Sequence, residues 1–117
     1  MVQELLHALQ AQDEVALSAC FTPDGQLFDY CPCVNGGNAH IIYGREGIEM
    51  LYRGLFALNR LTVAEPAEDC ETEGTYFGTY DGPYVYARVM IKETDGEGLI
   101  KKAVIVPGEG GRIWVSM

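Results

Sequence analysis

The breaks between the β-rich segments in the second half of this 117-residue chain are short, and this constrains the fold more than any other feature. Val, Ile, Tyr and Thr are typical of strands, and they are concentrated in residues 61–63, 74–80, 84–93, 99–106 and 112–117. The later segments are separated only by residues 81–83, 94–98 and 107–111, which have turn composition. Parallel strands need a crossover of about a dozen residues or more. The sequence therefore predicts an antiparallel meander.

The first half predicts helices. Near the N-terminus, apolar residues recur at the spacing of one helical face, at Val2, Leu5, Leu6 and Leu9. A short second helix is expected after Asp13, whose side chain suits an N-cap. The third begins at Arg45 and runs to about Leu58, with an apolar face formed by Ile48, Leu51, Tyr52, Leu55 and Phe56. Helices followed by strands indicate an α+β fold, and the length fits a single domain over residues 1–117.

A further strand is predicted between the second and third helices. Pro23 and Gly25 suit a type I turn over residues 22–25, after which residues 26–31 alternate in polarity. Asp29 falls on the strand face that also carries Leu27 and Cys31, whereas Phe28 and Tyr30 fall on the other face. Residues 31–39 read as a loop, and residues 40–43 as a brief extended piece.

Composition excludes several classes of partner. The formal net charge of -9 argues against nucleic acid and against an anionic membrane surface. No run approaches the roughly 18 apolar residues of a spanning helix, and residues 1–12 lack the features of a secretory signal, so a cytoplasmic location is expected. The four cysteines are too few and too irregularly spaced for a disulfide scaffold, so free thiols are expected.

No metal and no cofactor are expected. Cys31, Cys33 and His40 offer three metal-binding side chains, but zinc sites favour a Cys-x(2 to 4)-Cys pair together with a second pair, which is missing. The glycine-rich segments have neither the spacing nor the Lys-Ser/Thr of a phosphate loop, so they are interpreted as turns.

Three runs in the first half resemble the nuclear-transport-factor-2-like superfamily, in particular its SnoaL-like and ketosteroid-isomerase-like branches. They are LLHALQAQD at residues 5–13, FTPDG at residues 21–25 and YGREGI at residues 43–48. The resemblance implies a cystatin-like fold, in which a curved antiparallel sheet packs against three helices from the N-terminal half as a cone with one open pocket. It also implies a homodimer formed through the sheet.

In ketosteroid-isomerase-like enzymes a carboxylate on the strand after the second helix serves as the base. Alignment through residues 23–25 places that position at Tyr30, with Asp29 next to it. Because neighbouring strand residues point to opposite faces, only one of the two enters a pocket. The oxyanion-stabilising tyrosine that these enzymes carry on the first helix has no counterpart, since that region reads Leu5-Leu6-His7. A true ketosteroid isomerase is therefore not expected.

Two residues are candidates for catalysis. Asp29 would have a raised pKa and suit a general base if its strand face lines the pocket, and it would be a solvated carboxylate otherwise. His40 follows a glycine-rich loop near the expected pocket mouth, where it would be an acid or base near neutral pH or a surface histidine.

The candidates for ligand contact are Tyr30, Tyr52, Tyr86, Arg88 and Trp114. Tyr86 and Arg88 share one face of the strand at residues 84–93, opposite an apolar face, so they either line a polar pocket or form a dimer surface. Trp114 either floors the pocket or joins the same interface. Tyr76 and Tyr80, with Phe77 between them, read as an aromatic edge strand.

The first functional hypothesis is a small protein that binds an apolar or aromatic molecule in a conical pocket. The second is a proton-transfer enzyme of isomerase or dehydratase type, with Asp29 or His40 as the base. The third is an assembly module whose pocket is vestigial. Fold alone does not choose between them.

Overall fold

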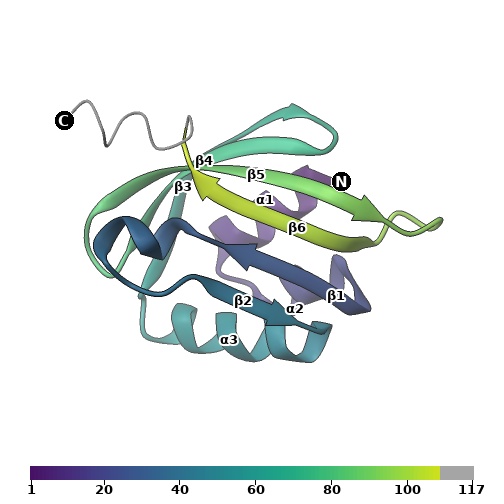
Figure 1. The fold of residues 1–117 in the computed structure, drawn as a ribbon, viewed down its shortest axis with the longest axis horizontal. Coiled ribbons are helices and arrows are strands. Elements are labelled where there is room, and N and C mark those ends of the chain that lie inside the picture. The colour runs from purple at the N-terminus through teal and green to yellow at the C-terminus, as the bar shows by residue number, and fades with distance from the viewer. Residues whose placement is uncertain (109–117) are drawn as a thin grey trace.

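The structure, a computed structural model, describes residues 1–108. Its helices are α1 (Val2–Ala11), α2 (Glu14–Ala19) and α3 (Arg45–Ala57), and a 3-10 helix, η1, covers Cys31–Asn35. The strands are β1 (Phe21–Asp29), β2 (His40–Tyr43), β3 (Leu61–Cys70), β4 (Glu73–Tyr80), β5 (Tyr84–Thr94) and β6 (Ile100–Pro107). Figure 1 shows their arrangement. Within the described range, no helix combines the length and the apolar character needed to cross a membrane.

All six strands belong to one sheet, in the order β2-β1-β6-β5-β4-β3. The run from β3 to β6 is antiparallel throughout, which confirms the predicted meander. The sheet is nevertheless mixed, because β1 pairs with β6 in parallel. The sequence pattern did not indicate this pairing, since it joins two segments that are separated by α3 and the rest of the meander.

The turn predicted at residues 22–25 is wrong. β1 begins at Phe21, directly after α2, and already includes these residues. Its pairing with β6 shifts register between Phe21 and Gln26, so the segment forms an irregularity within the strand. A Cβ on Gly25 would lie 2.9 Å from the Cβ of Phe21 and 3.0 Å from the carbonyl oxygen of Ile100. Glycine is therefore required here by close packing and not by a reversal of the chain.

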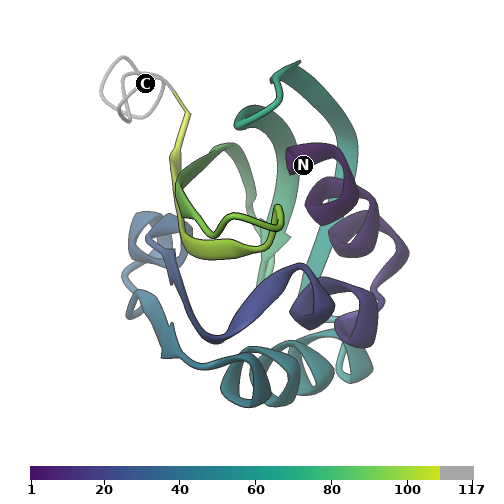
Figure 2. The same ribbon diagram turned by 90° about the vertical axis from the view of Figure 1, so that its right-hand side faces the viewer.

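The helices cover one face of the sheet, and the sheet curves around them (Figure 2). The predicted inner face of α1 is confirmed, since Val2, Leu5, Leu6 and Leu9 are all buried. The predicted N-cap is confirmed as well, because the Asp13 side chain accepts a hydrogen bond of 3.0 Å from the amide of Ala16. The α+β fold expected from the sequence is the fold observed.

Side-chain alternation along β5 separates the two faces of the sheet. Val85, Ala87 and Val89 are fully buried, which confirms them as core residues. Tyr84, Tyr86 and Arg88 alternate with them and therefore lie on the outer face, away from the helices. This alternation decides which candidate residues can reach the interior.

The interpretation of β4 as an aromatic edge is wrong. β4 lies between β3 and β5, and Tyr76 and Tyr80 are buried, with 0% and 4% of their surfaces exposed. Only Phe77 of the three aromatic residues faces outward. The three aromatic residues do not form one surface, because the period of two puts Tyr76, Gly78 and Tyr80 on the inner face and Phe77 on the outer face. The strand predicted at residues 112–117 lies outside the described residues.

Candidate functional site

Asp29 is a fully buried carboxyl group on the inner face of β1. Its Oδ1 accepts a hydrogen bond of 2.9 Å from the amide of Cys31, and its Oδ2 accepts one of 2.8 Å from the hydroxyl of Tyr80. The hydroxyl of Tyr80 is also hydrogen-bonded to that of Tyr76. Burial raises the pKa of Asp29, and the bonds from Cys31 and Tyr80 oppose that rise. The result is a continuous polar chain from Tyr76 through Tyr80 to Asp29.

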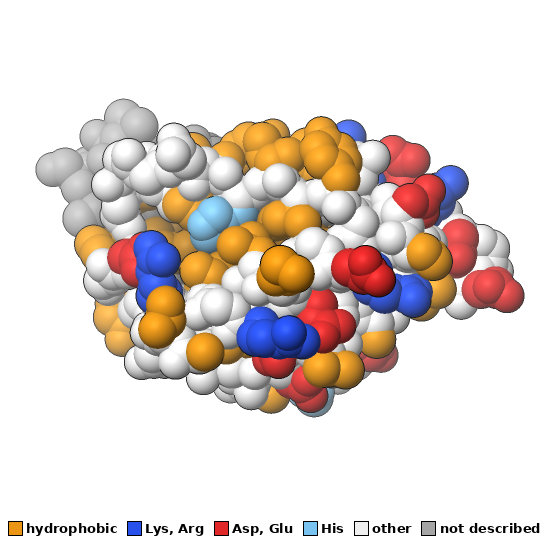
Figure 3. All heavy atoms as spheres, turned by 90° about the horizontal axis from the view of Figure 1, so that it is seen from below, with side chains coloured by type: hydrophobic (Ala, Val, Ile, Leu, Met, Phe, Trp, Pro, Cys, Tyr) orange, Lys and Arg blue, Asp and Glu red, His pale blue; other side chains and the backbone are white. Residues whose placement is uncertain are grey.

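Tyr80 also lines a pocket of about 370 Å³, which we call the mouth pocket. Its apolar walls are Pro32, Leu55, Leu61 and Pro83, and its polar side chains are Asn35, His40, Arg60, Tyr80 and Asp81. Figure 3 shows a face of the molecule on which a histidine lies in a hollow among apolar side chains, near a pair of opposite charges. The volume falls in the range of small-molecule sites.

His40 lies directly across the β1–β2 ladder from Asp29. Directly opposed residues project from the same face of a sheet, with their Cβ atoms about 4.5–5.5 Å apart. The structure thus brings together the two residues predicted as catalytic candidates. Within the described residues, Nδ1 of His40 is buried and has no hydrogen-bond partner. A buried imidazole nitrogen without a partner is costly unless something binds it.

Tyr52 approaches the same interior from α3. Its side chain is fully buried, its ring lies 5.6 Å from that of Phe56, and its hydroxyl has no partner among the described residues. Burial raises its pKa well above 10, and the charge of Asp29 adds to the shift. Burial likewise raises the pKa of the Cys31 thiol, so this thiol is not a nucleophile. Asp29 is therefore enclosed by other buried side chains, and Tyr80, to which it is hydrogen-bonded, is the residue of the two that lines the mouth pocket.

The unpartnered hydroxyl of Tyr52 leads to a stability prediction. We expect Tyr52→Phe to raise the free energy of unfolding by about 1 kcal/mol, because it removes a buried polar group without breaking a hydrogen bond. The matched change Tyr76→Phe should lower it by about 1 kcal/mol, because the bond to Tyr80 is lost. Urea denaturation of both variants measures the difference, and equal losses in both would show that the Tyr52 hydroxyl has a partner.

The remaining candidates are not brought to this site. Tyr30 lies directly after β1, before η1, with 37% of its surface exposed. Tyr86 lies on the outer face, where its ring is 4.9 Å from that of Phe77. Arg88, on the same face, pairs with Asp69 at 2.9 Å and with Glu73 at 3.5 Å. Trp114 lies outside the described residues.

Sequence reasoning missed Tyr80, which links Asp29 to the mouth pocket, and Tyr76 behind it. The pattern Tyr76-x-Gly78-x-Tyr80 was a usable signal, because it places two aromatic residues on one strand face with room between them. A Cβ on Gly78 would lie 2.9 Å from the ring of Tyr76 and 3.1 Å from that of Tyr80. The glycine therefore makes the space in which both tyrosine rings lie.

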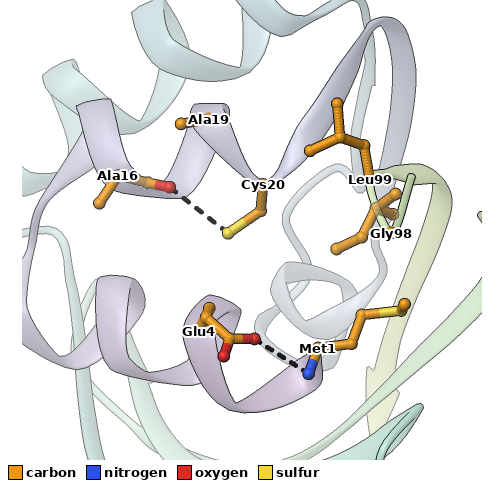
Figure 4. A pocket seen from close by; sticks show the side chains of 8 residues that line it. Met1, Glu4, Ala16, Ala19, Cys20, Gly98 and Leu99 are labelled. Atoms are coloured by element: carbon orange, nitrogen blue, oxygen red, sulfur yellow. Dashed lines mark hydrogen bonds and ion pairs between the residues drawn. The ribbon is translucent and has the colours of Figure 1, made fainter.

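A second, larger groove of about 460 Å³ lies between α1, α2 and the β5–β6 connection (Figure 4). Its charged groups, the Met1 ammonium and the Glu4 carboxylate, are paired with each other at 2.9 Å. Burial raises the pKa of Cys20, whose thiol donates to the carbonyl oxygen of Ala16, so it is a weak nucleophile. This groove has a larger volume than the mouth pocket, but its charged groups are paired with each other and its thiol is a weak nucleophile.

No family model and no curated protein matches this chain. Solved structures do match it. A nuclear-transport-factor-2-like protein of unknown function from Cytophaga hutchinsonii is 14% identical, with a TM-score of 0.63 over 97% of this chain and 90% of its own. A hypothetical protein with a ketosteroid isomerase-like fold from Catenulispora acidiphila, in complex with trimethylamine, is 20% identical, with a TM-score of 0.60 over 92% and 85%.

The orange carotenoid protein of Anabaena (Nostoc), which binds canthaxanthin, is 16% identical, with a TM-score of 0.66 over 99% of this chain but only 38% of its own. Other matches are described as ketosteroid isomerase-like, SnoaL-like or cystatin-like. At these identities the matches establish the fold, and they agree with the superfamily that the first half of the sequence resembles.

Proposed function

We propose that this chain, which has the nuclear-transport-factor-2-like fold, binds a small organic molecule in the mouth pocket. The apolar body of the ligand packs against Leu55, Leu61 and Pro83, and a polar group meets His40 and Tyr80. The observation that carries the proposal is the buried Nδ1 of His40, which has no hydrogen-bond partner within residues 1–108, at a pocket that Tyr80 also lines. The fold supports it in general terms, because the similar protein from Catenulispora acidiphila was solved in complex with trimethylamine.

Asp29 acts in this account through Tyr80. Because Tyr80 donates its proton to Asp29, its oxygen accepts from Tyr76, and a donor on the ligand would use the second lone pair of that oxygen. Hydrogen bonds in such a chain polarise one another, so the carboxyl group makes the Tyr80 oxygen a better acceptor. The preferred ligand group at this point is consequently a donor such as a hydroxyl or an amide N–H.

Tyr80→Phe tests this role. We expect it to weaken binding of a phenol or an anilide by about tenfold, the value of one buried hydrogen bond, and to leave the apolar contacts intact. Isothermal titration of both proteins measures the change. Tyr84→Phe is the matched control, because Tyr84 lies on the outer face and is exposed. Equal affinity of the Tyr80→Phe variant and the parent protein would remove Tyr80 from the site.

Proton transfer is the second candidate function, and the cross-strand placement of His40 and Asp29 favours it. His40 would take or give the proton, since it lines the pocket, while Asp29 would stabilise the imidazolium from behind. His40→Gln would then lower kcat by about 100-fold or more and change KM little. Loss of binding without a selective loss of turnover would leave the simpler binding function.

We infer further that a second copy of the chain covers the outer face of the sheet. The register places Phe28 beside Val104 and Val104 beside Met90, so an apolar band crosses β1, β6 and β5. The pair of Phe77 and Tyr86 adds a second aromatic patch on β4 and β5. Lys102 adds a cation 5.4 Å from the ring centre of Phe28. An apolar band on the outer face of a sheet is typical of a subunit interface.

Val104→Arg should therefore convert a dimer into a monomer, because it buries an unpaired charge at the centre of the band. Light scattering during size-exclusion chromatography measures the mass. Lys101→Arg is the control, because it changes an exposed β6 side chain and keeps its charge. A monomeric parent protein at micromolar concentration would contradict the interface, and a dimer of the Val104→Arg variant would place it elsewhere.

A further inference from the structure

The mouth pocket contains a guanidinium group that forms an ion pair with one of the protein's own carboxylates. Of the described residues that line the mouth pocket, Arg60 is the only lysine or arginine. Its Nε and Nη2 atoms lie 2.8 Å and 2.9 Å from the two carboxylate oxygens of Asp81, which also lines the pocket. This two-pronged geometry is the one in which arginine binds carboxylates most selectively.

The backbone holds both partners in place independently of this ion pair. Asp81 has a φ of 62° in the turn after β4, and its amide donates to the carbonyl oxygen of Arg60 at 3.0 Å. The amide of Arg60 in turn donates to the carbonyl oxygen of Leu55 at 2.8 Å. These backbone hydrogen bonds do not involve the two side chains, so they can persist when the side chains part.

Separating the Arg60 and Asp81 side chains also costs little free energy. The Arg60 and Asp81 side chains are 52% and 57% exposed, and exposed ion pairs contribute only about 0–1 kcal/mol. The guanidinium of Arg60 and, more weakly, the imidazole of His40 lower the pKa of Asp81. An anionic oxygen at this position is thus favoured by two groups that line the pocket, and an incoming carboxylate would find the same environment.

Resting on the proposed binding function, we propose that the ligand of the mouth pocket is a small carboxylic acid with an apolar or aromatic body. Its carboxylate displaces Asp81 from Arg60, and its body packs against Leu55 and Leu61. Asp81 is then an internal competitor that keeps the guanidinium paired while the pocket is empty. The body of such a ligand gains apolar contacts with Leu55 and Leu61, and these contacts offset the cost of displacing a carboxylate that is already attached to the chain.

Titration with benzoate and with its neutral analogue benzamide tests the proposal, with dissociation constants measured by NMR at constant ionic strength. Asp81→Asn frees Arg60 and should tighten benzoate binding about two- to fivefold. Arg60→Gln should weaken it about tenfold or more. Neither variant should change the affinity for benzamide by more than about twofold.

Asp69→Asn is the matched control, because it removes the same charge next to Arg88 on the outer face. It should leave benzoate binding unchanged, which separates release of Arg60 from the change in net charge. Weaker benzoate binding by the Asp81→Asn variant would overturn the proposal, as would benzoate binding that is insensitive to Arg60→Gln. Benzamide binding in the mouth pocket without any preference for benzoate would overturn it and leave the proposed function standing. Absence of binding by either compound would overturn both.

Discussion

Replacement of Asp29 by alanine is expected to lower the free energy of unfolding by about 2 to 4 kcal/mol. The carboxyl group accepts hydrogen bonds from the amide of Cys31 and the hydroxyl of Tyr80, and both donors would remain buried without a partner. Urea denaturation at pH 5 measures the loss. A loss below about 0.5 kcal/mol would mean that water replaces the carboxyl group and that the interior is wetter than this structure indicates.

Asp29→Asn is the matched variant, because asparagine keeps the shape and can accept from Cys31 while it donates to the Tyr80 oxygen. The buried carboxyl has a raised pKa, so the folded protein retains a proton that the unfolded chain has already lost. Protonated Asp29 stabilises the folded parent protein. This stabilisation is fully present below the ordinary pKa of 3.8, and it is lost as the pH rises through the pKa of Asp29 in the folded state. The variant lacks this loss.

The stability of the Asp29→Asn variant relative to the parent should therefore increase with pH across that window, by up to about 1.4 kcal/mol per pH unit, and then level off. The other carboxylates contribute equally to the stability of both proteins, so their pH dependence cancels in the comparison. Glu4 is one of these, and because its pKa is lowered its contribution changes with pH in the opposite direction. A difference between the two proteins that stays constant with pH would show that Asp29 titrates as an ordinary solvated carboxylate.

Gly78→Ala is expected to destabilise the protein by about 1 to 3 kcal/mol. A Cβ at this position would lie 2.9 Å from the Tyr76 ring and 3.1 Å from the Tyr80 ring, with the carbonyl oxygen of Thr62 at 3.3 Å. The rings would have to separate, which strains the hydrogen bond between their hydroxyl groups and the contact of Tyr80 with Asp29. Thermal unfolding measures the loss of stability.

Gly54→Ala provides the control, because Gly54 lies within α3 and a Cβ there would meet nothing within 4 Å. That substitution should raise stability by about 0.5 to 1 kcal/mol, since alanine favours the helix. If Gly78→Ala also proves neutral or stabilising, the two tyrosines are not constrained by the glycine, and the polar chain to Asp29 is looser than proposed.

Much of the architecture could be predicted because local patterns specify it. The inner faces of α1 and α3 follow from apolar spacing, and the meander follows from short turns between β-rich segments. The parallel pairing of β1 with β6 could not be predicted in this way, since no local pattern indicates which strand a distant segment will join. The β1 irregularity was misread for a related reason, because Pro-Asp-Gly suits a bulge as well as a turn.

The site was only partly predictable. Alternation left Asp29 and Tyr30 as equal alternatives, and the structure places Asp29 inside because it shares its face with Leu27. The pairing of His40 with Asp29 depends on the β1–β2 register, and the role of Tyr80 depends on a contact across 51 positions of the chain. Such contacts are set by the tertiary fold. The catalytic and ligand-binding roles of these residues, the cytoplasmic location and the single-domain organisation stay predictions.

The most direct test of the central claim is to locate bound ligand on the protein. We would titrate ¹⁵N- and methyl-labelled protein with a small set of aromatic acids, amides and phenols and map the chemical-shift changes. We expect changes concentrated at His40, Leu55, Leu61 and Tyr80. These changes should be lost in a variant in which larger side chains replace Leu55 and Leu61 and fill the mouth pocket. Changes confined to the groove between Cys20 and Leu99, or none at millimolar ligand, would contradict it.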